Sequence, residues 1–180
     1  MTTPCRVRAA HAGDCEEIMR MIQELAQYEE RLNEMENSVE ALRQDGFEEA
    51  PFFSCMVAEL LEGEGTGPTL VGYSIFFRKY SSYTGRALFM DDLFVRRHYR
   101  GKGIGSQLLA SVAQECLLLG CPELQFHVLV RNTPAIKFYF SRGAKGLYTN
   151  ERFHLLRFQT NDLQRMVLSL EEPGSLQFGV

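Results

Sequence analysis

The residues with the clearest chemical potential form a glycine-rich stretch at 96–106, which reads Arg-Arg-His-Tyr-Arg-Gly-Lys-Gly-Ile-Gly-Ser. It lies between a strand-like run at 87–95 and an amphipathic pattern typical of a helix. Glycines let the backbone bend so that successive N–H groups converge, and a helix that starts there adds its positive dipole end. Basic residues also gather here, although the net charge of the chain is −4: Arg96, Arg97, Arg100 and Lys102. The stretch therefore predicts an anion site, with a diphosphate as the natural guest.

The spacing of the glycines separates this loop from two common nucleotide-binding loops. The Walker pattern GxxxxGK[ST] is absent, and the dinucleotide pattern GxGxxG fails because Leu108 stands in place of its third glycine. What remains is Arg100-x-x-Gly103-x-Gly105. The alternative is a plain strand-to-helix turn that needs glycine only for left-handed backbone geometry.

The composition predicts a single domain over 1–180. A chain of 180 residues that is 45% hydrophobic is long enough for one well-buried core and short for two. The N-terminus lacks the apolar core of a signal peptide, and no run approaches the ~20 apolar residues of a membrane span. We therefore expect a cytoplasmic protein without a membrane partner, and the local basicity argues against a nucleic-acid partner.

The cysteines and histidines do not indicate a metal site. The chain has five cysteines without a CxxC pair, an odd number that predicts free thiols in the absence of a signal peptide. The four histidines are scattered without ligand spacing. We expect no metal cofactor.

Residue periodicity predicts an α+β fold, a mixed α/β layer in which helices flank a central, mostly antiparallel sheet. A helix is expected from Asp14, where Asp-x-x-Glu resembles a capping box, and another from Thr133, with Thr133 as N-cap and Pro134 in the first turn. A short helix at 38–44 and the helix that follows the glycine loop complete the helical set. The expected strands are 5–10, 52–60, 69–80, 86–95, 124–130 and 152–159, with 62–68 as a hairpin connection.

Two motifs carry a resemblance to a known family. Arg100-x-x-Gly103-x-Gly105 resembles the acyl-CoA pyrophosphate loop (Arg/Gln-x-x-Gly-x-Gly/Ala) of the GNAT superfamily of N-acetyltransferases. The stretch 132–144 matches the superfamily's Asn-x-x-Ala-x-x-Phe-Tyr-x-x-x-Gly-Ala/Phe block. Within the superfamily, the segments 26–29, 45–47, 51–53 and 92–95 are similar to the spermidine/spermine (diamine) and thialysine acetyltransferases.

The resemblance implies a GNAT-like acyl-CoA N-acyltransferase fold, with acetyl-CoA as co-substrate, and assigns residues to its site. The positions that match the family's cofactor-binding residues are Leu93, Phe94, Val95, Arg100, Gly101, Lys102, Gly103, Ile104, Gly105, Ser106, Asn132, Thr133, Pro134 and Ala135. Tyr139 would face the sulfur and protonate the departing thiolate, since a phenol donates a proton while neutral at pH 7. The alternative for Tyr139 is an aromatic core residue beside Phe138.

The acceptor amine must lose a proton before it attacks the thioester, and the resemblance places Asp91 where the diamine enzymes have Glu in a Glu-Asp pair. A carboxylate there accepts the proton directly or through water. Because adjacent strand residues point to opposite faces, we expect only one of Asp91 and Asp92 to reach the site. The expected acceptor-binding residues are Tyr28, Glu29, Asp91, Gln125, Phe126, His127 and Glu151.

The acceptor segment departs from the polyamine enzymes at Ser82, Tyr83, Arg131 and Phe153, where those enzymes have Asp, Trp, Trp and Trp. Losing a carboxylate and aromatic surfaces, and gaining a cation, weakens the case for a long polyamine. The resemblance thus implies a small primary amine as partner, with thialysine-like amino acids ahead of polyamines or diamines. A protein or peptide amine acetyltransferase and a non-catalytic CoA-binding protein are the alternatives. Because the resembled enzymes are homodimers, we expect one here, with 161–180 at the interface.

Overall fold

The computed structural model describes residues 4–61, 69–145, 161–162 and 164, and divides into two compact units, Met1–Asn132 and Thr133–Val180. The first unit contains β1 (Cys5–Ala9), α1 (Cys15–Tyr28), α2 (Val39–Phe47), β2 (Ser54–Leu60), β3 (Thr69–Ser81), β4 (Gly85–Val95), α3 (Ile104–Leu118) and β5 (Leu124–Phe126). Three short 3₁₀ turns join them: η1 (Ala12–Asp14), η2 (Leu32–Glu34) and η3 (Arg97–Tyr99). The second unit contains α4 (Thr133–Phe140).

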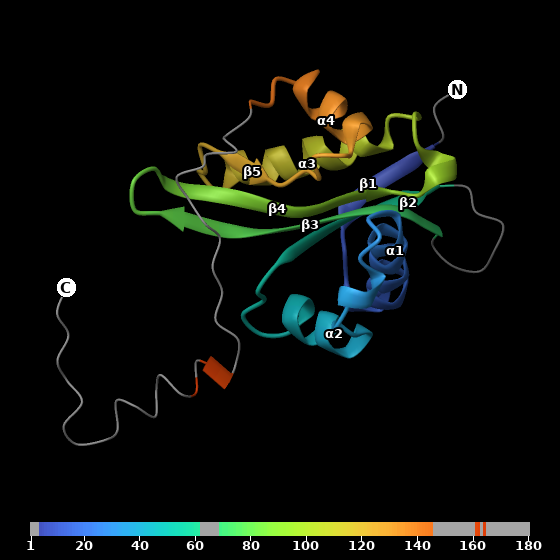
Figure 1. Cartoon of the computed structure of the whole chain (residues 1–180), viewed down its shortest axis with the longest axis horizontal. Helices are drawn as coiled ribbons and strands as arrows, with labels where there is room; N and C mark the ends of the chain where they lie inside the picture. The colour runs from blue at the N-terminus through green and yellow to red at the C-terminus, as the bar shows by residue number, and fades with distance from the viewer. Residues whose placement is uncertain (1–3, 62–68, 146–160, 163, 165–180) are drawn as a thin grey trace. The chain divides into compact units, whose positions relative to one another are not determined.

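The strands form one sheet in the order β1-β2-β3-β4-β5 (Figure 1). β1 to β4 pair antiparallel in sequence, and β5 pairs parallel with β4 after the crossover through α3. The predicted α+β architecture with a mostly antiparallel sheet is therefore confirmed.

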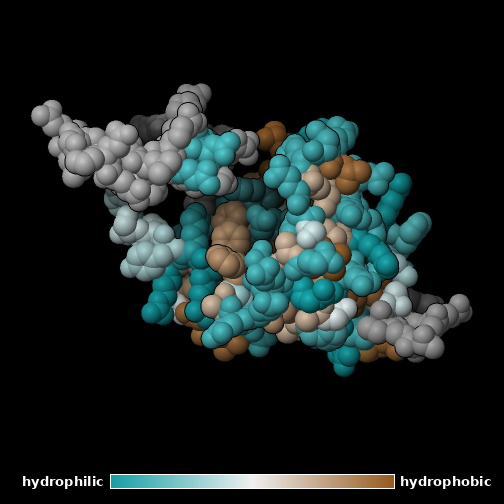
Figure 2. All heavy atoms as spheres, turned by 90° about the horizontal axis from the view of Figure 1, so that it is seen from below, coloured by the Kyte–Doolittle hydropathy of each residue, from teal (hydrophilic) through white to brown (hydrophobic). Residues whose placement is uncertain are grey.

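Helices cover both faces of this sheet, with α1 and α2 on one side and α3 on the other (Figure 1). On the first face, Ile18 and Met21 of α1 pack with Tyr73 and Phe94 of the sheet. On the second, Ile104 and Leu108 of α3 pack on strand residues such as Val71. Apolar residues recur at intervals of three and four in the sequences of both helices, which predicts one buried face for each, and these residues form those faces. Hydrophilic residues cover most of the surface seen from the side of α1 and α2 (Figure 2).

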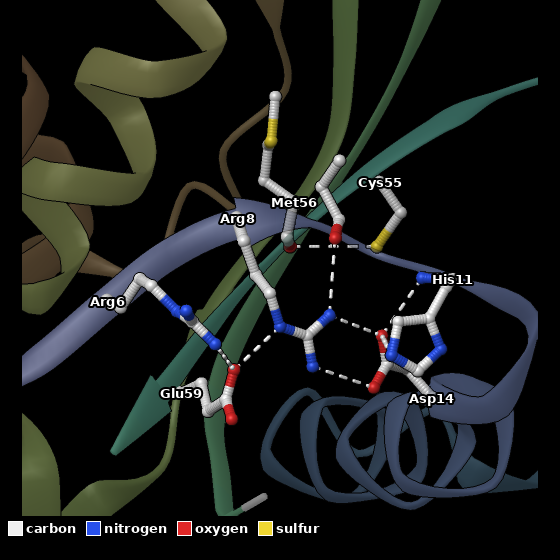
Figure 3. Close-up of polar contacts among 8 residues, drawn as sticks. Arg6, Arg8, His11, Asp14, Cys55, Met56 and Glu59 are labelled. Carbon is white, nitrogen blue, oxygen red and sulfur yellow. Dashed lines mark hydrogen bonds and ion pairs between the residues drawn. The ribbon is translucent and has the colours of Figure 1, made fainter. Parts of the chain in front are cut away.

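Asp14 precedes α1 as predicted, but its side chain does not cap that helix. The carboxylate instead accepts the backbone N–H of His11 at 2.9 Å and two bonds from the Arg8 guanidinium, at 2.7 and 3.0 Å (Figure 3). Arg8 also donates to Glu59 of β2 at 2.6 Å. The expected local cap therefore gives way to an ionic network that ties β1, β2 and the start of α1, because the buried carboxylate of Asp14 requires a charged partner.

Several predicted boundaries differ from the structure, and β2 begins at Ser54 rather than at residue 52. The second helix runs past Gly46 to Phe47, and Ser38 caps it by accepting the Ala41 N–H. β5 ends at Phe126 rather than at residue 130. Thr133 is the first residue of α4 rather than its cap, a shift of one position that is common at helix ends. The strand expected at 152–159 lies outside the described residues.

Candidate active site

The glycine loop between β4 and α3 has the backbone geometry of an anion cradle. Gly101 and Gly103 have φ values of +74° and +84°, a region that side-chain-bearing residues rarely adopt. A Cβ placed on either glycine would meet nothing within 4 Å, so both backbones face open space. Gly103 directly precedes α3, whose first N–H groups have no partner within the helix. These features fit the diphosphate of an acyl-CoA.

The basic residues beside the loop have different tasks. Arg96 forms ion pairs with Glu17 at 2.7 Å and Glu24 at 2.9 Å on α1 and bonds the Leu70 carbonyl, so it joins the sheet to α1. Arg100 donates from Nε to the Val95 carbonyl at 2.8 Å and lies over the Tyr28 ring. Arg96 therefore belongs to the basic cluster in sequence, but in the structure two carboxylates distant in sequence already neutralise it.

β4 presents one of its edges next to this loop. Leu93 and Val95 pair with β3 on one side, whereas β5 pairs only with Leu88–Met90. The described pairing between β4 and β5 thus ends before Asp91. An edge of this kind offers main-chain groups to an extended ligand, as the pantetheine arm of an acyl-CoA requires.

Asp91 and Asp92 sit at an irregularity of β4. Ile75 pairs with Asp92 and Phe76 with Met90, so Asp91 is an extra residue without a partner on β3. The expectation that strict alternation selects one of the two carboxylates therefore does not apply, because alternation requires a regular strand. Burial separates them instead: Asp91 is exposed, whereas Asp92 is partly buried on the face of Tyr73 and Phe94.

Asp92 lines a cavity of about 140 Å³ between the sheet and the end of α1. Its polar lining residues are Glu29, Arg31, Glu34 and Asp92, and its apolar ones are Ile22, Leu25, Ala26 and Met35. We call this the acidic cavity, because three carboxylates face one guanidinium. Such a lining favours a cationic guest with an apolar stem.

The environment of Asp92 opposes its ionisation. Burial raises the pKa of Asp92 to about 6, and the neighbouring Asp91 and Glu29 charges act in the same direction. The Tyr73 hydroxyl, which donates to Asp92 Oδ2 at 2.9 Å, and Arg31 act against this rise. Burial, followed by the charge of Asp92, holds the pKa of Tyr73 well above its usual value, so Tyr73 stays a donor. A carboxyl group with a pKa near neutrality is suited to proton transfer.

The end of α1 brings the predicted acceptor residues to this cavity. Glu29 lines it and lies 3.7 Å from Arg31, which binds Glu34 at 2.8 Å. Tyr28, one residue earlier, stacks against Arg100 of the glycine loop, with 5.1 Å between the guanidinium and the ring. The structure thus brings Tyr28 and Glu29 between the loop and Asp92.

The residues expected from β5 form a neighbouring cluster. Gln125 bonds Lys79 at 2.8 Å and Glu123 at 2.7 Å, and His127 packs edge-on against Phe89 with ring centroids 5.0 Å apart. Phe126 pairs with Met90 in the β4–β5 register. This cluster adjoins the bulge on β4, while Glu151 lies outside the described residues.

The second unit carries the remaining predicted residues. Asn132 ends the first unit with its N–H on the Leu129 carbonyl, and α4 follows with Thr133, Pro134 and Ala135 in its first turn. Tyr139 lies in the last turn of α4, with its ring edge-on to Phe138 at 5.1 Å between centroids.

A sequence model of the acetyltransferase (GNAT) family matches residues 17–144, more than half of the chain and across both units. The chain belongs to this family. GNAT proteins are acyl-CoA-dependent N-acetyltransferases, so the protein is an enzyme of that class, and the predicted family is confirmed.

Two curated relatives show which acetyltransferases this GNAT protein resembles in sequence. A thialysine N-epsilon-acetyltransferase of Bos taurus is 41% identical over 162 residues, which cover 89% of this chain and 95% of the bovine protein. A spermidine/spermine N(1)-acetyltransferase-like protein 1 of Homo sapiens is 38% identical over 89% of this chain and 23% of its own length.

Solved structures share the GNAT fold. An aminoglycoside acetyltransferase from an uncultured soil metagenomic sample aligns with a TM-score of 0.67 and 18% identity over 86% of this chain and 97% of that one. At this identity, the likeness concerns the fold alone. Among the residues that the structure describes, no helix is long and apolar enough to span a membrane, and no three metal-binding side chains cluster.

Sequence reasoning gave Asp92 no chemical role and did not consider Arg31, Glu34 or Tyr73. The Asp-Asp pair was visible, but the burial of Asp92 depends on α1 and η2, which lie more than 50 residues earlier. No local pattern could have revealed that neighbourhood.

Proposed function

We propose that this GNAT enzyme transfers an acetyl group from acetyl-CoA directly to a small primary amine, with thialysine-like amino acids preferred over diamines and polyamines. The observation that carries the proposal is the acidic cavity, whose lining residue Glu29 directly follows Tyr28, the residue that Arg100 of the glycine loop contacts. A cavity with carboxylates and an apolar wall suits an aminoalkyl chain, and the loop suits a diphosphate.

The chemistry begins with an amine that arrives as an ammonium ion and has no lone pair for attack. Asp92 binds this cation and, with a pKa of about 6, is ionised and ready to take its proton near pH 7. Asp91, exposed beside it, relays the proton through water. Acetyl-CoA, when bound, supplies the acetyl group as a reactive thioester.

The neutral nitrogen then forms the new amide bond to the acetyl carbon as the bond from that carbon to sulfur breaks. Tyr139 donates a proton to the departing sulfur and is reprotonated by the second proton that the nitrogen loses as the amide forms, while the first proton passes from the carboxylates to solvent, so that a neutral amide and a neutral thiol result. The main-chain edge of Leu93–Val95 and the glycine loop orient the cofactor. Asn132, Thr133, Pro134 and Ala135 complete its channel in this proposal.

A thioester-consumption assay with a panel of amines tests the proposed function. The panel contains thialysine, lysine, a diamine, spermidine and a lysine-containing peptide, and CoA release is measured at equal amine concentration. We expect the highest kcat/KM for thialysine. Activity on the peptide alone would establish the protein-acetylating alternative, and no CoA release with any amine would establish the non-catalytic one.

A homodimer belongs to the same proposal, with the segment 161–180 at the two-fold interface. Light scattering of the full chain at micromolar concentration should give the mass of a dimer. A monomeric mass would contradict the proposal, and a dimer that persists after deletion of 164–180 would show that the tail does not hold it together.

A further inference from the structure

Arg131, in the segment after β5, reaches the rim of the acidic cavity from about 100 residues away in the sequence. Its Nη1 donates to Glu30 Oε2 at 3.0 Å, and its Nη2 donates to the backbone carbonyl of Glu29. Glu29 is itself a lining residue of the cavity. The guanidinium of Arg131 is therefore held beside Glu29, which lines the cavity, and beside Glu30, the next residue in the chain.

The turn after α1 shows why Arg131 is held at this place. Glu30 has a φ of 59°, and the N–H groups of Glu30 and Arg31 bond the carbonyls of Gln27 and Ala26, the pattern of a left-handed helix end. Glycine is the usual residue at that position, and a glutamate there costs about 1 kcal/mol. Glu30, which occupies this position in place of glycine, is the residue whose carboxylate binds Arg131.

Arg31 and Arg131 differ in the number of ionic hydrogen bonds that hold their guanidinium groups. Arg31 binds Glu34 through two nitrogens, at 2.8 and 3.0 Å, and also lies near Glu29. Arg131 contacts one carboxylate oxygen of Glu30. The Arg131 side chain is 59% exposed and the Glu30 side chain is 77% exposed. An exposed pair of this kind adds little stability, so a competing carboxylate can replace Glu30 readily.

We propose that Arg131 selects acceptors that carry a carboxylate: it binds the carboxylate of an amino-acid substrate while the reacting amine occupies the acidic cavity. This inference rests on the proposed function. A guanidinium binds a carboxylate through two parallel hydrogen bonds, whereas a diamine has no carboxylate there and leaves its second ammonium, which an amino acid also carries, beside the guanidinium without a compensating negative charge. Arg131 is thus a specificity-determining residue that favours amino acids over diamines.

A matched pair of acceptors tests this role. Thialysine and the diamine left after removal of its carboxylate differ only in the group that Arg131 binds. In Arg131→Gln, we expect kcat/KM for thialysine to fall about tenfold, mainly through KM, while that for the diamine stays equal or rises. Arg131→Lys should restore part of the thialysine activity, because it keeps the charge without the two-pronged geometry.

Arg20→Gln is the control, because Arg20 is an exposed arginine of α1 paired with Glu17 at 2.8 Å, and both acceptors should react unchanged. Equal losses for both acceptors in Arg131→Gln, or no loss for either, would overturn the inference. If the wild-type enzyme acetylates neither amine, the proposed function fails, and calorimetry then decides the role of Arg131. Tenfold weaker binding of thialysine to Arg131→Gln would support it, and equal binding would refute it.

Discussion

Replacing Asp92 by asparagine should stabilise the protein at neutral pH, although we place Asp92 in the reaction. A rise in pKa from 3.8 in the unfolded chain to about 6 in the fold means that folding opposes ionisation of this group. At about 1.4 kcal/mol per pH unit, the ionised carboxylate costs up to about 3 kcal/mol at pH 7. Asparagine removes the charge and keeps an oxygen that accepts the Tyr73 hydroxyl.

The sign of the pH dependence makes the prediction specific. Between pH 4 and 6 the folded wild type holds a proton on Asp92 that the unfolded chain releases, so the contribution of Asp92 to the free energy of unfolding falls as pH rises. The advantage of Asp92→Asn should be largest at pH 7 and disappear near pH 4. The measurement is the free energy of unfolding from urea titrations at both pH values. A variant less stable than wild type at pH 7, or a difference independent of pH, would refute the reasoning.

Asp14→Asn is the matched control, because Asp14 is 3% exposed and has the opposite surroundings. Burial alone would raise the pKa of Asp14, but two bonds from Arg8 and one from His11 outweigh it and lower the pKa (Figure 3). The variant should lose about 3 kcal/mol at pH 7, because it leaves the Arg8 charge poorly compensated. This loss should persist at pH 4 and shrink only at lower pH, where the wild-type Asp14 is protonated.

Activity provides the second half of the Asp92 prediction. The kcat/KM of the wild type should rise with pH through about 6, where Asp92 loses its proton. Asp91→Asn should lower kcat/KM but keep its rise with pH, which is the acidic limb of the pH profile. Asp92→Asn should abolish this limb. A limb that survives in Asp92→Asn and disappears in Asp91→Asn would assign the proton acceptor to Asp91.

The other predictions concern the cofactor. Gly103→Val should weaken acetyl-CoA binding more than tenfold, as measured by calorimetry. Gly85 has the same φ of +84° and also faces open space, so Gly85→Val should share the backbone strain but bind acetyl-CoA normally. Equal affinities of the two variants for acetyl-CoA would reject the assignment of the loop. Tyr139→Phe should lower kcat about 100- to 10,000-fold with unchanged acetyl-CoA binding. Tyr80→Phe, on a 75% exposed tyrosine, should leave both unaltered, and wild-type turnover in Tyr139→Phe would remove that phenol from the mechanism.

The parts of the fold that sequence predicts well are those that neighbouring residues determine. The face of α3 that Ile104, Leu108 and Val112 form is buried as its periodicity indicated. The glycines at 101 and 103 adopt the positive φ that their loop required. In both cases the deciding interactions are local, so the pattern and the structure agree.

The parts that sequence misses depend on distant neighbours. Arg96 lies in a locally basic stretch of sequence, yet Glu24, 72 residues away, binds it. The bulge at Asp91 arises from the pairing of β3 with β4, and no property of the dipeptide itself indicates it. The local sequence at Asp14 likewise predicts a helix cap, but the Asp14 carboxylate binds Arg8 of β1 instead.

Three departures from local preference lie at or beside residues that line the acidic cavity: Asp91 without a partner on β3, the partly buried carboxyl of Asp92 and the left-handed backbone of Glu30. Each costs folding energy where a regular pairing, an apolar side chain or a glycine would not. Such costs persist in a protein when function requires them, and they gather at functional sites. Their coincidence near one cavity supports the acceptor site that we propose there, by an argument that does not depend on the family motifs, which concern the cofactor.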